Sequence, residues 1–170
     1  GYALPGMVLA VGVLLPMTLV DRSLAGFLSD LVGEPVGLVL TGSVFALVFV
    51  YVARFTTVAY NSTQTGMAQL HPHLDAVART LGSGPSRLLR QIHMPLLRPA
   101  VLSGLLLVFI DVVKELPATL ILRPFNFETL ATRVYRLASD ERLAEASTAA
   151  LIIVALGLLP TIWLLILEQR

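Results

Sequence analysis

Three ionisable residues close an otherwise apolar stretch of this chain. Asp111, Lys114 and Glu115 follow residues 99–110, which carry no charge. Charged side chains at membrane depth are costly, so one hypothesis is that these three line a pathway for an ion or a substrate. The other is that they neutralise one another at the interface, since Lys114 lies three residues and Glu115 four residues from Asp111 on one helical face. The sequence leaves both hypotheses open.

Other residues that could do chemistry are few. His71, His73 and Asp75 lie close together, but structural zinc takes four ligands and the chain has no cysteine. We therefore expect a loop before a helix here, and no metal site. The sequence has no phosphate-binding Gly-x-x-x-x-Gly-Lys-Ser/Thr motif, no Gly-x-Ser-x-Gly and no His-Glu-x-x-His. It predicts a protein that is not an enzyme, has no catalytic residue and binds no cofactor of its own.

The composition indicates a membrane protein. Hydrophobic residues make up 56% of the 170 residues and charged residues 14%, against about 25% charged in an average soluble domain. The mean hydropathy is +0.82. A surface with so little charge must face lipid, where helices satisfy their own backbone groups. We predict an all-α integral membrane protein, a bundle of about four transmembrane helices with a cytoplasmic helix-turn-helix loop.

Four apolar stretches are long enough to be spans of that bundle. Three of them have no internal charge and about the length that a helix needs to cross about 30 Å of hydrocarbon. The remaining one is apolar until Asp111, and we interpret it as a span with a polar, broken outer end before Pro117. The predicted spans are about 4–20, 36–53, 99–113 and 148–167.

The distribution of arginine predicts the orientation of the spans, because positive residues are retained in cytoplasmic loops. Residues 54–98 hold five arginines, Arg54 among them, against the one acid Asp75. The predicted loop 21–34 holds one arginine and three acids, and residues 114–145 hold five of each sign. We therefore expect 54–98 to be cytoplasmic, and four crossings would place both ends of the chain in the cytoplasm.

Residues 74–95 predict a short helix-turn-helix between two spans. An apolar stripe at helical spacing ends at Gly82, which can terminate a helix, and Pro85 suits the first turn of a second one. Pro95 is expected to end that second helix. The plain interpretation is an amphipathic loop on the membrane surface. DNA binding is disfavoured because the unit is tethered at both ends by spans.

This segment resembles the cytoplasmic signature loop of binding-protein-dependent ABC importer permeases, the type I importers. The family pattern is Glu-Ala-Ala, three residues, Gly, nine residues, Ile, one residue and Leu-Pro. The residues in that frame here are Ala76, Val77, Ala78, Gly82, Ile92, Met94 and Pro95. Met94 for leucine nearly conserves volume. Ala76 removes the family glutamate, and Asp75 is a partial substitute because it points about 100° away around the helix.

Further segments are similar to the iron(III)-type permease subfamily, and they extend the resemblance over essentially the whole chain. The similar segments are 1–6, 52–55, 114–120, 123–125 and 129–133. The resemblance implies that 1–170 is one transmembrane permease domain, the C-terminal portion of a longer polypeptide, with 56–98 as its cytoplasmic coupling loop. It also implies a bacterial-type inner or plasma membrane.

The resemblance also implies partners. They are a pair of ABC ATPase subunits that hold the ATP, an external or periplasmic substrate-binding protein, a second permease domain and membrane lipid; no nucleic acid is expected. Leu81, Leu88 and Leu89 would enter a cleft on the ATPase. The residues expected in the coupling loop are Asp75, Ala76, Val77, Ala78, Arg79, Leu81, Gly82, Leu88, Leu89, Ile92 and Pro95.

Iron(III) is the cargo that the subfamily resemblance implies. It is a hard cation that prefers oxygen ligands, so Asp111 and Glu115 could line its route together with Lys114. Sulfate, molybdate, thiamine and phosphonate permeases share the same loop and remain alternatives. A passive channel or a secondary carrier is the competing function class. The predicted helix around Leu130, Val134 and Leu137 would cap the bundle, or gate the pore or meet the binding protein.

Overall fold

The structure is a computed structural model that describes residues 2–71 and 73–168, and over these residues it is helical with no strand. The order of elements is α1 (Gly6–Val32), α2 (Val44–Ala68), α3 (His73–Thr80), α4 (Pro85–Leu88), η1 (Leu89–His93), α5 (Met94–Val113), α6 (Pro117–Leu122), α7 (Leu130–Ser139) and α8 (Leu143–Glu168). Four of the described helices are long and apolar enough to cross a membrane. The predicted all-α membrane fold is confirmed.

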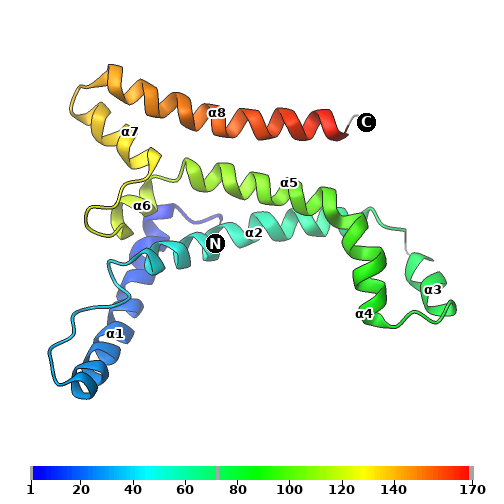
Figure 1. Cartoon of the computed structure of the whole chain (residues 1–170), viewed down its shortest axis with the longest axis horizontal. Coiled ribbons are helices and arrows are strands. Elements are labelled where there is room, and N and C mark those ends of the chain that lie inside the picture. Colours follow the sequence, from blue (N-terminus) through cyan, green and yellow to red (C-terminus); the bar gives the residue numbers. More distant parts are fainter. Residues whose placement is uncertain (1, 72, 169–170) are drawn as a thin grey trace.

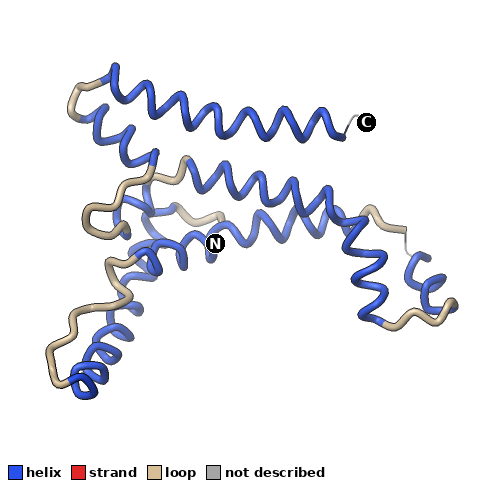
Figure 2. Tube along the Cα trace, in the orientation of Figure 1, coloured by secondary structure: helices blue, strands red, loops and turns tan. Residues whose placement is uncertain are grey.

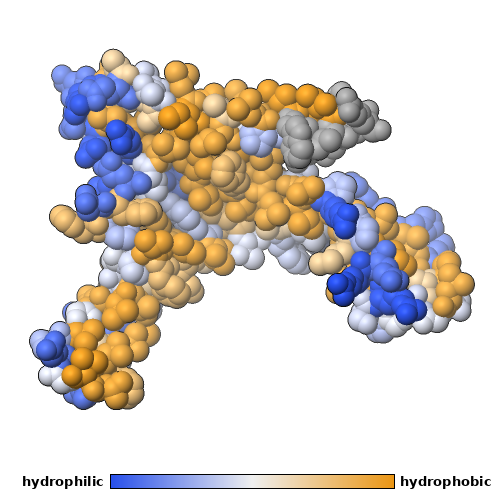
Figure 3. All heavy atoms as spheres, in the orientation of Figure 1, coloured by the Kyte–Doolittle hydropathy of each residue, from blue (hydrophilic) through white to orange (hydrophobic). Residues whose placement is uncertain are grey.

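Helices α2, α5 and α8 lie side by side, and α1 diverges from them (Figure 1). The short helices α3 and α4 project at one end of this row, and α6 and α7 lie at the other, as the trace in Figure 2 also shows. Hydrophilic residues gather over these two ends, with a largely hydrophobic surface between them along α5 and α8 (Figure 3). Such a distribution suits a slab of lipid between two aqueous phases.

Helices α2 and α5 pack closely because small residues face one another. A Cβ on Gly66 would collide with the Cβ of Ala100, and one on Gly104 would lie 3.0 Å from the Cβ of Ser62. The Ser62 hydroxyl donates to the Ala100 carbonyl at 2.7 Å. Small residues that let two backbones approach are typical of membrane helix pairs. The two helices therefore form one unit along most of their length.

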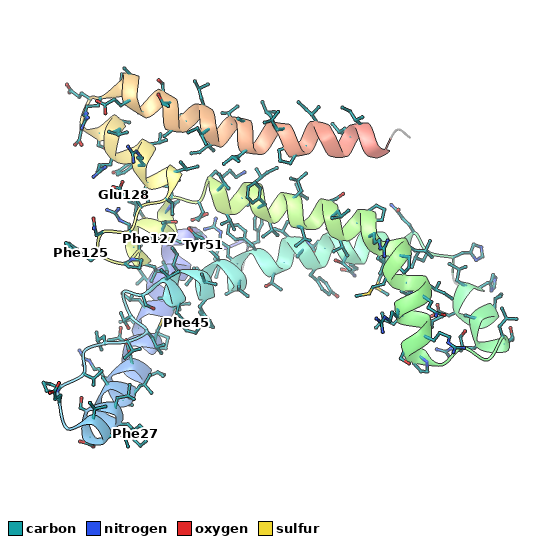
Figure 4. The ribbon with its side chains drawn as sticks, in the orientation of Figure 1. Phe27, Phe45, Tyr51, Phe125, Phe127 and Glu128 are labelled. Carbon is teal, nitrogen blue, oxygen red and sulfur yellow. The ribbon has the colours of Figure 1, made fainter. Side chains whose placement is uncertain are left out.

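The buried core lies where α1, α2 and α6 meet. Five buried residues form it, and Tyr51 and Phe127 pack against it from the side (Figure 4). The five are Ala10, Leu47, Val50, Ala118 and Leu122. The hydroxyls of Tyr51 and Thr119 are hydrogen-bonded within this region. Elsewhere many large apolar side chains along the spans are exposed, as expected for surfaces that face lipid or another chain.

The first helix is longer than predicted. Residues 21–32, expected in a loop, continue α1 to Val32. The physical reason is the carboxylate of Asp21, which is fully buried and accepts hydrogen bonds from the N–H groups of Val39, Leu40 and Thr41 at 2.6–3.0 Å. A buried carboxylate is tolerated when its oxygens are satisfied in this way. The loop that follows α1 folds back to supply these donors.

The second helix is shifted along the chain from the predicted span 36–53. It begins after the N-cap Ser43, and residues 56–68, expected in the cytoplasmic loop, continue it to Ala68. This part is rich in threonine, which lowers its hydropathy, and the sequence therefore predicted a loop. The hydroxyls of Thr56, Thr63 and Thr65 instead donate to the backbone carbonyls four residues earlier, at 2.5–2.9 Å. The polar groups are satisfied locally, so the helix can continue.

The helix that forms the third span does not end at Pro95, contrary to what the sequence predicted. Pro85 begins a helix that continues through Pro95 to Val113, with a π turn at Leu89–His93. The Met94 N–H donates to the Leu89 carbonyl, five residues earlier. A π turn loosens the ladder where a proline supplies no donor and crowds the preceding turn. At the other end, the expected break is confirmed, since α6 begins at Pro117.

Helices α7 and α8 complete the described chain. The predicted amphipathic helix around Leu130, Val134 and Leu137 is α7, and Leu137 is buried. It begins with a capping box between Thr129 and Thr132. Helix α8 begins at Leu143, five residues before the predicted span, and runs back beside α5 (Figure 1).

Candidate functional site

The turn between α3 and α4 has the geometry that the sequence predicts. Gly82 has φ of +79°, which glycine adopts with little strain. The N–H groups of Ser83 and Gly82 donate to the carbonyls of Ala78 and Arg79, both at 3.0 Å, so the helix ends in a Schellman motif. Pro85 then occupies the first turn of α4. The backbone of the turn therefore fixes how the two short helices follow one another.

The apolar residues of this segment divide into two groups. Leu81 is 79% exposed, Leu89 59% and Val77 56%. Leu88, expected to point outward with them, is only 7% exposed, and it lies at a cleft of about 300 Å³ between α3 and the α4–α5 junction. Ala78 is buried as well. Leu88 and Ala78 therefore hold the segment together, whereas Leu81, Leu89 and Val77 are free to meet another surface.

Asp75 forms a contact inside the chain. Its carboxylate lies 2.9 Å from Nε2 of His93, which joins α3 to the π turn. Ala76, the neighbour that replaces the family glutamate, is exposed. The sequence suggested Asp75 as a partial substitute for that glutamate, facing a partner. In the structure, Asp75 instead ties the two halves of the helix-turn-helix together.

The three ionisable residues at the other end of α5 do not form one cluster. Lys114 lies 2.8 Å from Asp111, and the Tyr2 hydroxyl lies 3.2 Å from the same carboxylate. The hydrogen bond with Asp111 raises the pKa of Lys114 above its ordinary value, so the ammonium stays charged. Glu115 pairs with a different residue. The helix ends at Val113, so the expected spacing of four along one helical face no longer applies.

The partner of Glu115 is Arg54 on α2, with 3.2 Å between Nη1 and Oε1. Glu115 is 6% exposed, and its Oε1 also accepts the Ala118 N–H at 3.2 Å. Gly6 of α1 packs against both side chains, since a Cβ there would lie 2.7 Å from Oε1 of Glu115. This ion pair joins α1, α2 and α6. The expectation that Arg54 belongs to the arginine-rich loop is therefore wrong.

A polar groove between α2 and α5 was missed by the sequence analysis. Its volume is about 680 Å³, and Tyr2 and Asp111 also lie along it. The available signal was the recurrence of polar residues every four positions in 57–69, which places them on one helical face. The polar residues in its walls are Thr57, Asn61, Ser62, Thr65, Gln69 and Ser103.

The loop between α6 and α7 carries a second group of charges. Glu128 lies 3.1 Å from Arg136 and 3.9 Å from Arg123. Phe125 is fully exposed at the edge of this loop, whereas Phe127 points toward the core (Figure 4). Among the side chains that the structure describes, no group of three histidine, aspartate or glutamate residues converges as metal ligands.

The sequence of the whole chain matches one protein family. The model of the binding-protein-dependent transport system inner membrane component covers residues 1–170. The chain belongs to this family. The resemblance carried by the segment around Gly82 is thereby confirmed, and with four apolar helices the protein is a multi-pass inner membrane permease component.

Curated relatives of this permease component divide between two cargoes. The Fe(3+)-transport system permease protein FbpB 2 of Haemophilus influenzae is 29% identical over 116 residues, which is 68% of this chain and 23% of that protein. The protein PhnV of Salmonella typhimurium, named for a 2-aminoethylphosphonate transport system permease, is 31% identical over 111 residues, 65% of this chain and 41% of that protein. The chain thus spans less than half the length of these relatives.

A third relative is the ferric transport system permease protein FbpB of Actinobacillus pleuropneumoniae, 26% identical over 100 residues, 59% of this chain and 14% of that protein. No solved structure matches the permease component. The two kinds of relative are similar to it to nearly the same degree. The comparisons therefore support transport by a permease, without choosing between the cargoes.

Proposed function

We propose that this permease component translocates substrate in an ATP-driven importer, receiving it from an external binding protein and drawing on ATP hydrolysis in separate ATPase subunits. The observation that carries the proposal is the α3–α4 segment. It is rigidly built around Gly82, yet it exposes Leu81, Leu89 and Val77 to solvent. A short amphipathic element with exposed apolar residues is suited to a groove on a partner.

The charges around this segment support a cytoplasmic position. Arg79, Arg87, Arg90 and Arg98 are exposed, and Asp75 is the acid among them. This bias persists although Arg54 lies elsewhere. Exposed arginines at the rim of a docking surface set its orientation more than its affinity. The placement of both chain ends in the cytoplasm stays a prediction, and the contact of Tyr2 with Asp111 puts the start of the described chain far from the α3–α4 segment.

A movement of the α3–α4 segment would reach the far end of the molecule through two connections. Helix α4 continues through the π turn into α5. Helix α5 is packed on α2 through Gly66, Ala100 and Gly104. Closure of an ATPase pair beneath would therefore shift α2 and α5 together. Packed helices change between discrete arrangements, so such a shift can convert an inward-facing pathway into an outward-facing one.

Iron(III) is the cargo that we propose, on the similarity to the ferric permeases and on the oxygen donors of the groove. Hard cations prefer carboxylate, hydroxyl and carbonyl oxygens. 2-Aminoethylphosphonate is the second candidate, because PhnV is equally similar. Measuring the uptake of each compound by the assembled transporter distinguishes the two candidates.

Copurification tests the importer itself. The full-length parent protein is isolated in mild detergent, and the recovered subunits are identified for the wild type, Gly82→Asp and Gly82→Asn. The wild type is expected to bring an ATP-binding subunit. Gly82→Asp is expected to lose it, because a charge is placed at the exposed turn and the backbone has φ of +79°.

Gly82→Asn is the matched control, since asparagine tolerates the left-handed conformation and adds no charge. It is expected to retain more of the ATP-binding subunit than Gly82→Asp. Recovery of the permease alone from every sample, the wild type included, would contradict the proposal. It would move the protein to the class of passive channels or secondary carriers.

A further inference from the structure

The groove between α2 and α5 follows the long axis of the two helices. Its walls extend from Thr57 to Gln69 on α2 and from Pro99 to Asp111 on α5. Twelve residues of α-helix rise by about 18 Å, which is more than half of a hydrocarbon core of about 30 Å. One end lies at Tyr2 and Asp111, and the other approaches the α3–α4 segment. The groove thus runs along the two helices over more than half the thickness of the hydrocarbon core.

Two hydroxyls along this groove have their hydrogens engaged within the chain. The hydroxyl hydrogen of Ser62 is used by the Ala100 carbonyl at 2.7 Å, and that of Thr65 by the Asn61 carbonyl at 2.9 Å. A hydroxyl whose hydrogen is engaged keeps its oxygen lone pairs. Asn61 and Thr57 add further oxygens on the same face of α2. These walls offer a series of neutral oxygen ligands.

The charge of the groove favours a cation over an anion as its occupant. No arginine, lysine or histidine is among the described residues that line it, and Asp111 is the single ionisable acid. The nearest ammonium, that of Lys114, is held by Asp111 at 2.8 Å. The guanidinium of Arg54 is bonded to Glu115. An anion in these walls would meet no cationic side chain among the lining residues and would lie near the Asp111 carboxylate, which is unfavourable.

Lys114 occupies the position that an arriving cation would take. Its side chain is 61% exposed, whereas the Asp111 side chain is 14% exposed. The lysine stem is long and flexible, so the ammonium can turn into solvent without disturbing α5. A cation that enters from this end can replace it at the carboxylate. The Asp111 carboxylate then has a cationic partner before and after the exchange.

We propose that the α2–α5 groove is the wall of a route for a hard cation, which enters by displacing Lys114 from Asp111 and passes along the oxygens of Thr57, Asn61 and Thr65. This inference rests on the proposed function and assigns its cargo class and specificity residues. It separates Glu115 from the pathway, because that carboxylate is occupied by Arg54 and Ala118.

Uptake by the complete transporter in proteoliposomes tests the route. The variants are Asp111→Asn and the double variant Thr57→Val with Thr65→Val, which removes hydroxyls at nearly constant volume. Thr56→Val is the matched control, since Thr56 is exposed and lies outside the groove. Iron(III) uptake is expected to fall about tenfold or more in the groove variants, the size of a lost contact to a charged group, and to be unchanged in the control.

ATP hydrolysis and recovery of the ATPase subunit are measured on the same samples, and both are expected to be retained. Normal iron(III) uptake by the groove variants would overturn the route and leave the importer standing. Uptake of 2-aminoethylphosphonate but not of iron(III) by the wild type would overturn the cation assignment. Loss of the ATPase subunit from the wild type would instead count against the proposed function itself.

Terbium(III) tests the exchange at Asp111 without transport. It is a hard cation whose luminescence is sensitised by a nearby tyrosine, and Tyr2 lies 3.2 Å from Asp111. Added to the detergent-solubilised transporter, it is expected to bind more tightly in Lys114→Gln than in the wild type, and not at all at this site in Asp111→Asn. Equal signals from the three proteins would overturn the displacement of Lys114.

Discussion

The two ends of the α2–α5 pair differ in whether their charged side chains are paired inside the chain or exposed. At one end, Arg54 and Glu115 are paired in the interior, and three helices meet around them. At the other end, the arginines are exposed and the apolar side chains of Leu81 and Leu89 point outward. The first end pairs the charges of Arg54 and Glu115 within the chain, whereas the second leaves its charged and apolar side chains exposed for a partner. One pair of helices thus carries a completed junction and an unfinished interface.

The largest effect is expected from breaking the completed junction. Arg54→Ala leaves Glu115 buried without a counter-charge, and removing one member of a buried pair costs about 3–5 kcal/mol. The loss is measured as the free energy of unfolding, or the shift in melting temperature, in detergent. Replacing both residues, as Arg54→Met with Glu115→Leu, is expected to recover most of it. A double variant no more stable than Arg54→Ala would show that the pair is not what joins these helices.

The second comparison is made inside the α3–α4 segment itself. Leu88→Ala is expected to cost about 2–3 kcal/mol because it removes a buried side chain. Leu81→Ala is expected to change stability by less than about 0.5 kcal/mol, as for most exposed positions. The amount of ATPase subunit that copurifies should show the reverse order, with a greater decrease for Leu81→Ala than for Leu88→Ala. If both variants lost stability equally, the division between anchoring and docking leucines would be wrong.

The connection between the two ends is tested at a glycine. Gly66→Ala places a Cβ against Ala100, and overpacking of this kind costs about 1–3 kcal/mol. Gly26→Ala is the control, because nothing lies within 4 Å of a Cβ there and alanine is the better helix former. ATP hydrolysis and uptake are compared as well, since a disturbed α2–α5 contact should uncouple them. Equal behaviour of the two variants would remove the α2–α5 contact from the coupling path.

The smallest effect is expected from the contact between α3 and the π turn. Asp75→Ala or His93→Ala removes one hydrogen-bonded pair, worth about 0.5–1.5 kcal/mol. Global stability should fall only slightly, and amide exchange in α3 should become faster. Arg79→Ala is a suitable control, since Arg79 is exposed on the same helix. Unchanged exchange in Asp75→Ala would mean that this pair does not hold α3 in place.

Features encoded locally were predictable from the sequence. The turn at Gly82, the start of α4 at Pro85 and the break before Pro117 each depend on residues close along the chain. Long runs of apolar residues also predicted the membrane spans. What these features share is that the backbone preference of one residue, or the hydropathy of one segment, decides the outcome.

The remaining features depend on partners far apart in the chain. Arg54 and Glu115 are 61 residues apart, and the spacing of neither residue points to the other. Asp21 was assigned to a loop because the N–H groups that satisfy it lie 18 to 20 residues further on. The polar face of α2 lowered its hydropathy, so a helix was read as a loop, and the groove that this face lines was missed. The errors at Arg54 and Asp21 came from charged groups whose partners lie far along the chain, whereas the threonines of α2 are satisfied by carbonyls only four residues away.

The π turn at Leu89–His93 has a consequence for how this molecule could diverge. A π turn is in effect one residue inserted into an α-helix. Residues before and after it are therefore out of step by about 100° around the helix axis. Deleting one residue from this turn would restore the regular ladder and swing the α3–α4 segment around that axis, while α5 kept every contact with α2. A single-residue change in length can thus point the same docking segment at a differently placed partner.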